Sequence, residues 1–283
     1  MSRRSPPNPP AAHHAPRPAP PLPRAGARWA LFLDVDGCLL DFADEPEAVV
    51  VPAALPGLLQ DLHVTLGGAL ALVSGRGLSS LERLFPTPCR TMVGLHGLEL
   101  RRGDGSRRDL RADPAHAARM RAATLALAER FQGVELEDKH QAVALHCRRA
   151  PWQLPALRRA AEALVSDLPG YELQPGNLVM EFKPAGMDKG RAVAELLLEP
   201  PFIGRLPVYL GDDLTDEHGF ATANLENGIS VRVGSREPSL AQFTLPSPAA
   251  VHAWLARVRD ALQSPPGVPV HADRVGGHSS QSS

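Results

Sequence analysis

The amino-acid sequence predicts an α/β protein with a parallel-sheet core and a smaller α+β unit inserted into it. Short apolar runs, such as residues 29–33 and 69–73, end abruptly in small or polar residues and are followed by helical patterns. Repeated units of strand, polar turn and helix are typical of a parallel sheet with helices on both faces. Residues 107–184 differ, because they show the order helix, strand, strand twice. That order indicates an antiparallel sheet in the inserted unit.

Length, composition and charge limit the function classes. A chain of 283 residues, 43% of them hydrophobic, can bury one or two cores. Its formal net charge of −1 provides no field that would attract nucleic acid or an anionic membrane. Cys38, Cys89 and Cys147 contain no CxxC pair, so neither a disulfide framework nor a zinc site is indicated. Because no apolar run approaches the roughly 20 residues of a membrane-spanning helix, we expect a soluble, cytoplasmic protein.

Two terminal segments are predicted to lie outside the folded domains. Residues 1–27 are rich in proline and arginine and contain no acidic residue, so we expect a disordered tail. A transit peptide is the alternative, although the prolines would break the amphipathic helix that it needs. Residues 263–283 are expected to form a second tail. The core then comprises residues 28–106 and 185–262.

The first predicted strand, over residues 29–33, leads directly into an acidic turn. The turn contains Asp34, Asp36 and Gly37. In open α/β sheets, ligands bind beyond the carboxyl ends of the strands, so these carboxylates lie where chemistry is expected. Gly37 lets the turn approach a ligand closely.

The other core elements follow in chain order. We expect a helix over 52–66, a strand over 69–73 before Ser74, a helix over 78–85, a strand over 92–94, a helix over 189–198 and a strand over 207–210 before Gly211 and Asp212. Because parallel strands end at the same edge of a sheet, the polar residues after these strands are expected to converge.

The inserted unit is expected to have one charged sheet face. Its predicted elements are helices over 113–131 and 152–168 and strands over 134–139, 142–147, 171–174 and 178–182. Alternation along the strands places Glu137, Lys139 and Glu181 opposite the apolar side chains. The helices cover the apolar face, so the charged face is either solvated or contacts a polar ligand.

Carboxylates dominate the predicted edge of the core sheet. Asp34 and Asp36 would lie near Asp212, Asp213 and Asp216. These carboxylates would repel one another unless a cation lay among them. Hard oxygen ligands suit Mg²⁺. Carboxylates also serve as nucleophiles that form aspartyl phosphates.

A hydroxyl and an ammonium complete the set needed for phosphoryl transfer. Ser74 follows a strand and Lys189 begins a helix. Phosphoryl transfer requires mainly that the charge on the phosphoryl oxygens be neutralised. Each residue alone would be an ordinary turn or surface residue, but their combination in this order favours a phosphotransferase site.

The motifs resemble those of the haloacid dehalogenase (HAD) superfamily of phosphotransferases. The matching segments are DVDG at 34–37, Ser74, Lys189 and GDDLTDE at 211–217. The insertion between Ser74 and Lys189 lies where C2-type caps occur in that superfamily, which implies an HAD-like Rossmannoid core with a cap domain at 107–184. Within the superfamily, SGR at 74–76, GLHG at 94–97, ELEDK at 135–139 and EFKP at 181–184 resemble the trehalose-6-phosphate phosphatases.

This resemblance implies roles for the core residues. Asp34 would be the nucleophile, and Asp36 would protonate the leaving sugar oxygen and then activate water. Asp34, the backbone carbonyl of Asp36, and Asp212 would hold Mg²⁺. Asp213 and Asp216 would support these ligands or replace them, and Ser74 and Lys189 would bind the phosphoryl oxygens.

The resemblance also implies how the substrate is chosen. Glu137, Lys139 and Glu181 match cap residues that bind the second sugar. Arg76 and His96 either contact phosphate or sugar, or serve only in turns and helix capping. Cys38 stands where the family usually has threonine. A nucleophilic Cys38 is the poorer interpretation, because no base lies next to it in the sequence.

The resemblance therefore implies a Mg²⁺-dependent phosphatase that acts on trehalose 6-phosphate, with functional coupling to a trehalose-phosphate synthase. Three alternatives remain open: a phosphatase for another sugar phosphate, such as a sucrose or glucosyl-glycerol type, a non-catalytic phospho-sugar sensor, and a phosphomutase. The charged cap face argues against a bisphosphate substrate and thus against the phosphomutase.

Overall fold

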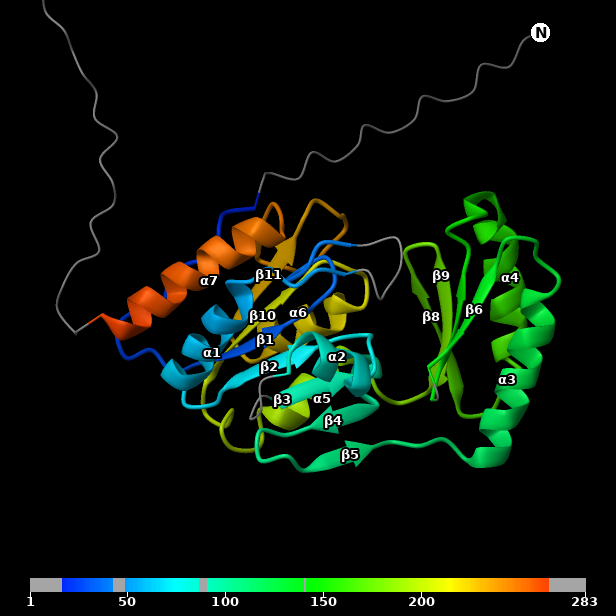
Figure 1. Cartoon of the computed structure of the whole chain (residues 1–283), viewed down its shortest axis with the longest axis horizontal. Helices are drawn as coiled ribbons and strands as arrows, with labels where there is room; N and C mark the ends of the chain where they lie inside the picture. Colours follow the sequence, from blue (N-terminus) through cyan, green and yellow to red (C-terminus); the bar gives the residue numbers. More distant parts are fainter. Residues whose placement is uncertain (1–16, 43–48, 87–90, 140, 265–283) are drawn as a thin grey trace, which may run out of the picture.

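A computed structural model describes residues 17–42, 49–86, 91–139 and 141–264. Its larger sheet has the strand order β12-β11-β10-β1-β2-β3-β4-β5 (Figure 1). The strands are β1 (Trp29–Leu33), β2 (Leu70–Val73), β3 (Thr91–Gly94), β4 (Glu99–Arg101), β5 (Arg107–Asp109), β10 (Leu206–Gly211), β11 (Ile229–Val233) and β12 (Phe243–Leu245). Pairing is parallel from β12 to β3, whereas β4 and β5 extend the sheet as an antiparallel edge.

Helices cover both faces of this sheet. They are α1 (Leu55–Thr65), α2 (Leu78–Leu84), α5 (Lys189–Leu196), α6 (Asp216–Leu225) and α7 (Pro248–Gln263). Alternating residues of β1 contact opposite layers: Trp29 stacks on Trp254 of α7, whereas Phe32 stacks on Phe202, which follows α5. Two layers of helices therefore enclose the apolar strands, with α1 beside α7 and α5 beside α6.

The inserted unit has its own sheet and its own apolar core. Its strands β6 (Glu135–Asp138), β7 (Val143–His146), β8 (Tyr171–Gly176) and β9 (Val179–Pro184) are antiparallel in the order β6-β7-β9-β8. Helices α3 (Pro114–Ala128) and α4 (Leu154–Val165) lie on the side away from the larger sheet, so the other face of the small sheet is turned toward it (Figure 1). The predicted fold class, a parallel α/β core with an inserted antiparallel α+β unit, is confirmed.

Short elements refine the predicted boundaries. Asp113 does not belong to α3 but caps it, accepting hydrogen bonds from the N–H groups of Ala115 and His116. Leu178 was expected inside a strand, yet it has φ +55° in the turn between β8 and β9. The 3₁₀ helices η1 (Leu95–Gly97) and η2 (Pro151–Gln153) precede β4 and α4.

The expectation of a disordered tail is wrong for residues 17–27. Arg17 donates to the carbonyls of Ser239 and Ala241, each at 2.7 Å. Trp254 donates its indole N–H to the Pro20 carbonyl at 3.3 Å. This segment is therefore held by hydrogen bonds to distant parts of the core, which composition alone does not reveal. The remainder of the predicted tails, residues 1–16 and 265–283, lies outside the described residues.

Among the helices that the structure describes, none combines the length and the apolar character needed to cross a membrane.

Candidate active site

Asp34 lies at the carboxyl end of the central strand and is buried. Its N–H donates to the Leu210 carbonyl of β10 at 3.0 Å, which continues the parallel ladder by one residue. By alternation along the chain, Asp34 is on the same side as Phe32, toward α5 and α6. The first residues of these helices are therefore its neighbours.

Lys189 joins two of the buried carboxylates. Its ammonium donates to Asp34 Oδ1 and to Asp216 Oδ1, both at 2.7 Å. Burial alone would lower the pKa of Lys189, but the charges of Asp216 and Asp34 outweigh it and hold the pKa well above its ordinary value. Lys189 is therefore a permanent cation at the start of α5.

Asp216 is saturated with hydrogen bonds. Its Oδ1 accepts from Lys189 and from the Tyr209 hydroxyl, while its Oδ2 accepts from the N–H groups of Asp212 and Asp213, each at 3.0 Å. Both oxygens are thus used by protein donors. This arrangement suits a residue that holds the Asp212 turn in place better than one that binds a metal directly.

Three carboxylates offer oxygens to a cation. One oxygen each of Asp34, Asp212 and Asp216 lies within 4.8 Å of the others. Burial, followed by the negative charge of Asp216, raises the pKa of Asp34 well above its ordinary value and that of Asp212 to about 7. Such repulsion is what a bound divalent cation relieves, so Asp34 and Asp212 fit a hard metal ion.

Metal-free protein should lose stability as pH rises, because of Asp212. The pKa of Asp212 is about 7 in the folded protein, above its unfolded value near 3.8. Protonated Asp212 therefore contributes its full stabilisation below about pH 4, and this stabilisation is lost as pH rises through 7. The measurement is the free energy of urea unfolding in EDTA for the wild type minus that for Asp212→Asn. We expect this difference to fall between pH 5 and 8. The limiting slope for one proton is about 1.4 kcal/mol per pH unit.

Comparison with Asp212→Asn removes the contribution of His96, whose pKa is lowered by burial and which gives the opposite slope. Saturating Mg²⁺ should abolish the fall, since it favours the ionised carboxylates. A difference that does not vary with pH would contradict the prediction.

Asp36 is held by an arginine from the neighbouring strand end. Arg76 Nε and Nη2 donate to the two carboxylate oxygens of Asp36, both at 2.7 Å, and the Arg76 N–H donates to Ser74 Oγ at 3.1 Å. Gly37, with φ +77°, has no room for a side chain, because a Cβ there would lie 2.3 Å from Asp212. The acidic turn, Ser74 and Asp212 are therefore packed together at one edge of the sheet.

The inserted unit closes this edge from the other side. Lys139 donates to Glu181 Oε2 at 2.9 Å, and His96 of the core lies 3.7 Å from the same oxygen. Burial would raise the pKa of Glu181, but the charge of Lys139 and the contact with His96 hold it well below its ordinary value. His96 reaches this position beside Gly75, where a Cβ would lie 2.7 Å from the imidazole.

One cleft contains every sequence-predicted site residue except Asp216. It has a volume of about 540 Å³. Its members from the prediction are Asp34, Asp36, Ser74, Arg76, His96, Glu137, Lys139, Glu181, Lys189, Asp212 and Asp213. The predicted convergence of the core strand ends with the charged face of the inserted sheet is thus observed.

Several cleft residues were not singled out from the sequence. His146 Nε2 lies 2.8 Å from Glu137 Oε2 and lowers the pKa of that carboxylate. Arg148 and Phe42 also line the cleft. His146 is two residues from Ala144, which pairs with both Glu137 and Glu181, so strand parity could have identified it.

Cys38 is buried, and burial followed by the charge of Asp34 raises the pKa of its thiol well above the ordinary value. The protonated thiol is a poor nucleophile, so a nucleophilic Cys38 stays the poorer interpretation.

Comparisons with known proteins point to one family. The sequence profile described as trehalose-phosphatase matches residues 32–249. A probable trehalose-phosphate phosphatase of Sinorhizobium fredii is 45% identical over 230 residues, which cover 81% of this chain and 86% of that protein. The trehalose-6-phosphate phosphatase of Escherichia coli is 39% identical over 241 residues, which cover 85% of this chain and 90% of that protein.

Solved structures point to the same fold. The C-terminal domain of a C. albicans trehalose-6-phosphate phosphatase superposes with a TM-score of 0.74 at 22% sequence identity, covering 84% of this chain and 94% of that chain.

Proposed function

This chain belongs to the trehalose-phosphatase family, and we propose that it hydrolyses trehalose 6-phosphate to trehalose and inorganic phosphate. It is a phosphoric monoester hydrolase of the HAD superfamily, as its motifs predicted. The observation that carries the proposal is a single cleft in which the carboxylates of Asp34 and Asp212 face the Lys139–Glu181 ion pair. Chemistry and sugar recognition are thereby assigned to opposite walls.

The first proposed step is attack by Asp34 on phosphorus. As the bond from Asp34 to phosphorus forms, the bond from phosphorus to the sugar oxygen breaks, and Asp36 gives its proton to that oxygen. The two hydrogen bonds from Arg76 occupy both carboxylate oxygens of Asp36. Arg76 must therefore release Asp36 before Asp36 gives its proton to the sugar oxygen. Arginine also binds phosphoryl oxygens, so Arg76 can exchange the carboxylate for the phosphoryl group.

The second proposed step is hydrolysis of the aspartyl phosphate. Asp36, now ionised, takes a proton from a water molecule whose oxygen attacks phosphorus. The bond from phosphorus to Asp34 then breaks, which releases inorganic phosphate and restores both carboxyl groups to their starting states. Lys189 and Ser74 are proposed to bind the phosphoryl oxygens in both steps.

A divalent metal is expected from the family, and we propose that it is Mg²⁺. Asp34, the backbone carbonyl of Asp36, and Asp212 would hold it, since hard oxygen ligands suit this ion. When bound, it would neutralise charge on the phosphoryl group. Asp213 remains an alternate ligand, whereas the hydrogen bonds of Asp216 favour a supporting role.

Residues 107–184 are proposed to act as a cap that recognises the sugar. Glu181 Oε1, His96 Nδ1 and His146 Nδ1 are buried and have no hydrogen-bond partner among the described residues. Sugar hydroxyls both donate and accept hydrogen bonds, so a disaccharide can satisfy such atoms. Closure over the substrate would also exclude water from the first step.

Phosphate release from a panel of substrates tests the proposal. The panel comprises trehalose 6-phosphate, sucrose 6-phosphate, a glucosyl-glycerol phosphate and glucose 6-phosphate, each with Mg²⁺ and with EDTA. We expect kcat/KM for trehalose 6-phosphate to exceed the others by at least about tenfold, and EDTA to stop turnover. Equal turnover of all four would remove the disaccharide claim. A sensor would bind trehalose 6-phosphate and release nothing, and a phosphomutase would yield an isomer without free phosphate.

Cap variants sharpen the same test. Because Glu181 and Lys139 are proposed to bind only the sugar, Glu181→Gln and Lys139→Met should each lower kcat/KM for trehalose 6-phosphate by about 10- to 100-fold. Hydrolysis of p-nitrophenyl phosphate, which lacks the sugar, should be unchanged. The matched control is Glu135→Gln on β6, the strand that leads to Lys139, because the Glu135 side chain is 52% exposed and pairs with Arg149. Equal losses on both substrates would contradict sugar recognition by the cap.

The substrate chemistry also implies a supplier. A trehalose-phosphate synthase would produce the disaccharide phosphate, and we propose that the two activities are coupled in the cytoplasm.

A further inference from the structure

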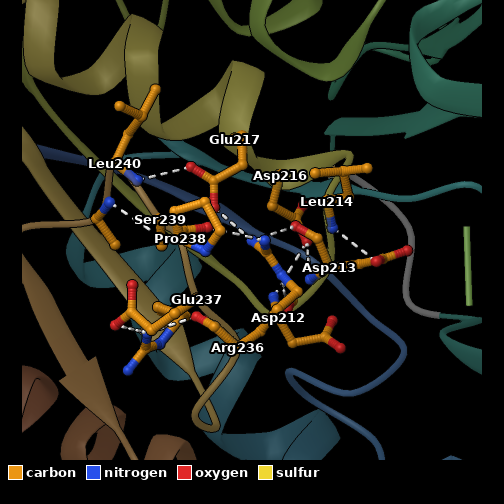
Figure 2. Close-up of polar contacts among 12 residues, drawn as sticks. Asp212, Asp213, Leu214, Asp216, Glu217, Arg236, Glu237, Pro238, Ser239 and Leu240 are labelled. Atoms are coloured by element: carbon orange, nitrogen blue, oxygen red, sulfur yellow. Dashed lines mark hydrogen bonds and ion pairs between the residues drawn. The ribbon is translucent and has the colours of Figure 1, made fainter. Parts of the chain in front are cut away.

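The turn that carries Asp212 and Asp213 is held by a loop with no part in the proposed mechanism. Residues 234–242 connect β11 to β12. Because Gly211 pairs with Arg232 across β10 and β11, this loop and the Asp212 turn leave neighbouring strands side by side. Figure 2 shows Arg236 of the loop pointing at Asp212, Asp213 and Glu217.

Arg236 binds the backbone of both acidic residues. Its Nε donates to the Asp212 carbonyl and its Nη2 to the Asp213 carbonyl, each at 3.2 Å (Figure 2). The N–H groups of the same two residues donate to Asp216 Oδ2. The backbone of the turn is therefore bound at its donors and at its acceptors.

Glu217 fixes the guanidinium in this position. It forms an ion pair with Arg236 Nη2, and its other oxygen accepts from the Leu240 N–H at 2.7 Å. Arg17 binds the same loop from outside through the carbonyls of Ser239 and Ala241. The planar fork of an arginine can bind two carbonyls and a carboxylate together, whereas a lysine cannot reproduce that geometry.

We propose that Arg236, held by Glu217, is a positioning residue for the metal-binding carboxylate of Asp212. Neither Arg236 nor Glu217 lines the cleft, so neither is placed to contact a substrate bound there. The inference rests on the metal site of the proposed function and assigns a role to the last residue of the GDDLTDE segment. Residues behind metal ligands typically change metal affinity by about 10- to 100-fold when they are replaced.

We attribute the expected effect of Arg236 on metal affinity to its geometry rather than to its charge, because that charge is paired. Glu217 offsets the guanidinium, so the pair adds little net field at Asp212. Two substitutions separate the effects: Arg236→Lys keeps the charge without the fork, and Arg236→Gln removes both. If geometry dominates, both should weaken metal binding to a similar extent.

The experiment measures Mg²⁺ binding directly in the full-length chain. Calorimetric titration with Mg²⁺ alone, together with the rise in Tm that Mg²⁺ causes, is compared for wild type, Arg236→Gln, Arg236→Lys and Glu217→Gln. The matched control is Arg259→Gln, because Arg259 is 29% exposed against 28% for Arg236 but pairs with Asp61 and Asp260 away from the cleft. Urea unfolding in EDTA reports general destabilisation separately.

We expect Arg236→Gln and Arg236→Lys to raise the Kd for Mg²⁺ by about 10- to 100-fold, and Arg259→Gln to match the wild type. In phosphate release, kcat should recover as Mg²⁺ is raised. A wild-type Kd in Arg236→Gln, or an equal loss in Arg259→Gln, would overturn the inference. If Arg236→Gln does not fold, Glu217→Gln decides, since an unchanged Kd there overturns it too. Substrate hydrolysis by the wild type tests the proposed function, so either proposal can fail without the other.

Discussion

Replacing Asp34 with asparagine is expected to lower kcat for trehalose 6-phosphate by at least about a thousandfold, as loss of a nucleophile does in other enzymes. The amide cannot form the acyl phosphate, yet it keeps the size and an acceptor oxygen for Lys189. Phosphate release at saturating Mg²⁺ measures the loss. Asp61→Asn is the matched control, because Asp61 is an exposed carboxylate on α1 that pairs with Arg259.

The same variant should not destabilise the metal-free protein. Burial and the charge of Asp216 raise the pKa of Asp34, which means that its ionised form is costly in the fold. The free energy of unfolding in EDTA at pH 8 should therefore rise in Asp34→Asn, while the stabilisation by Mg²⁺ should shrink. Residual activity near the wild-type value would remove Asp34 as nucleophile, and a lower stability in EDTA would contradict the charge argument.

The strands that end at the cleft were predictable, because their runs are apolar and stop at polar residues. β4 and β5 were not, since the segments ELR and RRD have no apolar run and pair only at the antiparallel edge. β11 contains Arg232, which interrupts its apolar pattern but is buried through bonds to the carbonyls of Gly234 and Arg236. Tertiary contacts override the local pattern in these strands.

α7 could have been predicted from its start. Ser247 accepts from the Ala250 N–H at 3.3 Å, and Pro248 is the first helical residue. A serine cap, a proline and apolar residues at 251, 254, 255 and 258 together predict a helix here.

Whether a site contact could be predicted depends on how far apart its two partners lie in the sequence. The carboxylates and Lys189 belong to recognisable motifs, and strand parity grouped Glu137, Lys139 and Glu181. Arg76 contacts Asp36 through both carboxylate oxygens, a partner that neither of the alternatives open from the sequence, ligand binding or turn structure, had named. Arg236 lies 24 residues from Asp212 in a loop without a motif, so only the folded backbone reveals its contact.

A short stretch of chain connects the antiparallel sheet of the inserted unit to Lys189. Lys183, two residues beyond Glu181 on β9, is fully buried, pairs with Glu172 at 2.5 Å and donates to the Met187 carbonyl. Asp188 then caps α5, which begins at Lys189. This short stretch of chain therefore links the position of β9 to the position of Lys189.

Replacing Lys189 with methionine is expected to affect stability and catalysis together. The buried Asp34 and Asp216 would lose their shared cation, and breaking a buried ion pair in this way costs about 3 to 5 kcal/mol. Loss of a charged group that stabilises the phosphoryl oxygens should also lower kcat by at least about a hundredfold. Urea unfolding in EDTA and phosphate release at saturating Mg²⁺ measure the two effects.

A double variant distinguishes unpaired charge from lost packing. If uncompensated carboxylates cause the instability, then Asp34→Asn should raise the free energy of unfolding in EDTA by more in the Lys189→Met background than in the wild type, because the charge that it removes is unpaired there. Packing lost with the lysine side chain would not be restored by the second substitution. A gain no larger than in the wild type would therefore show that Lys189 supports the fold mainly by packing rather than by charge.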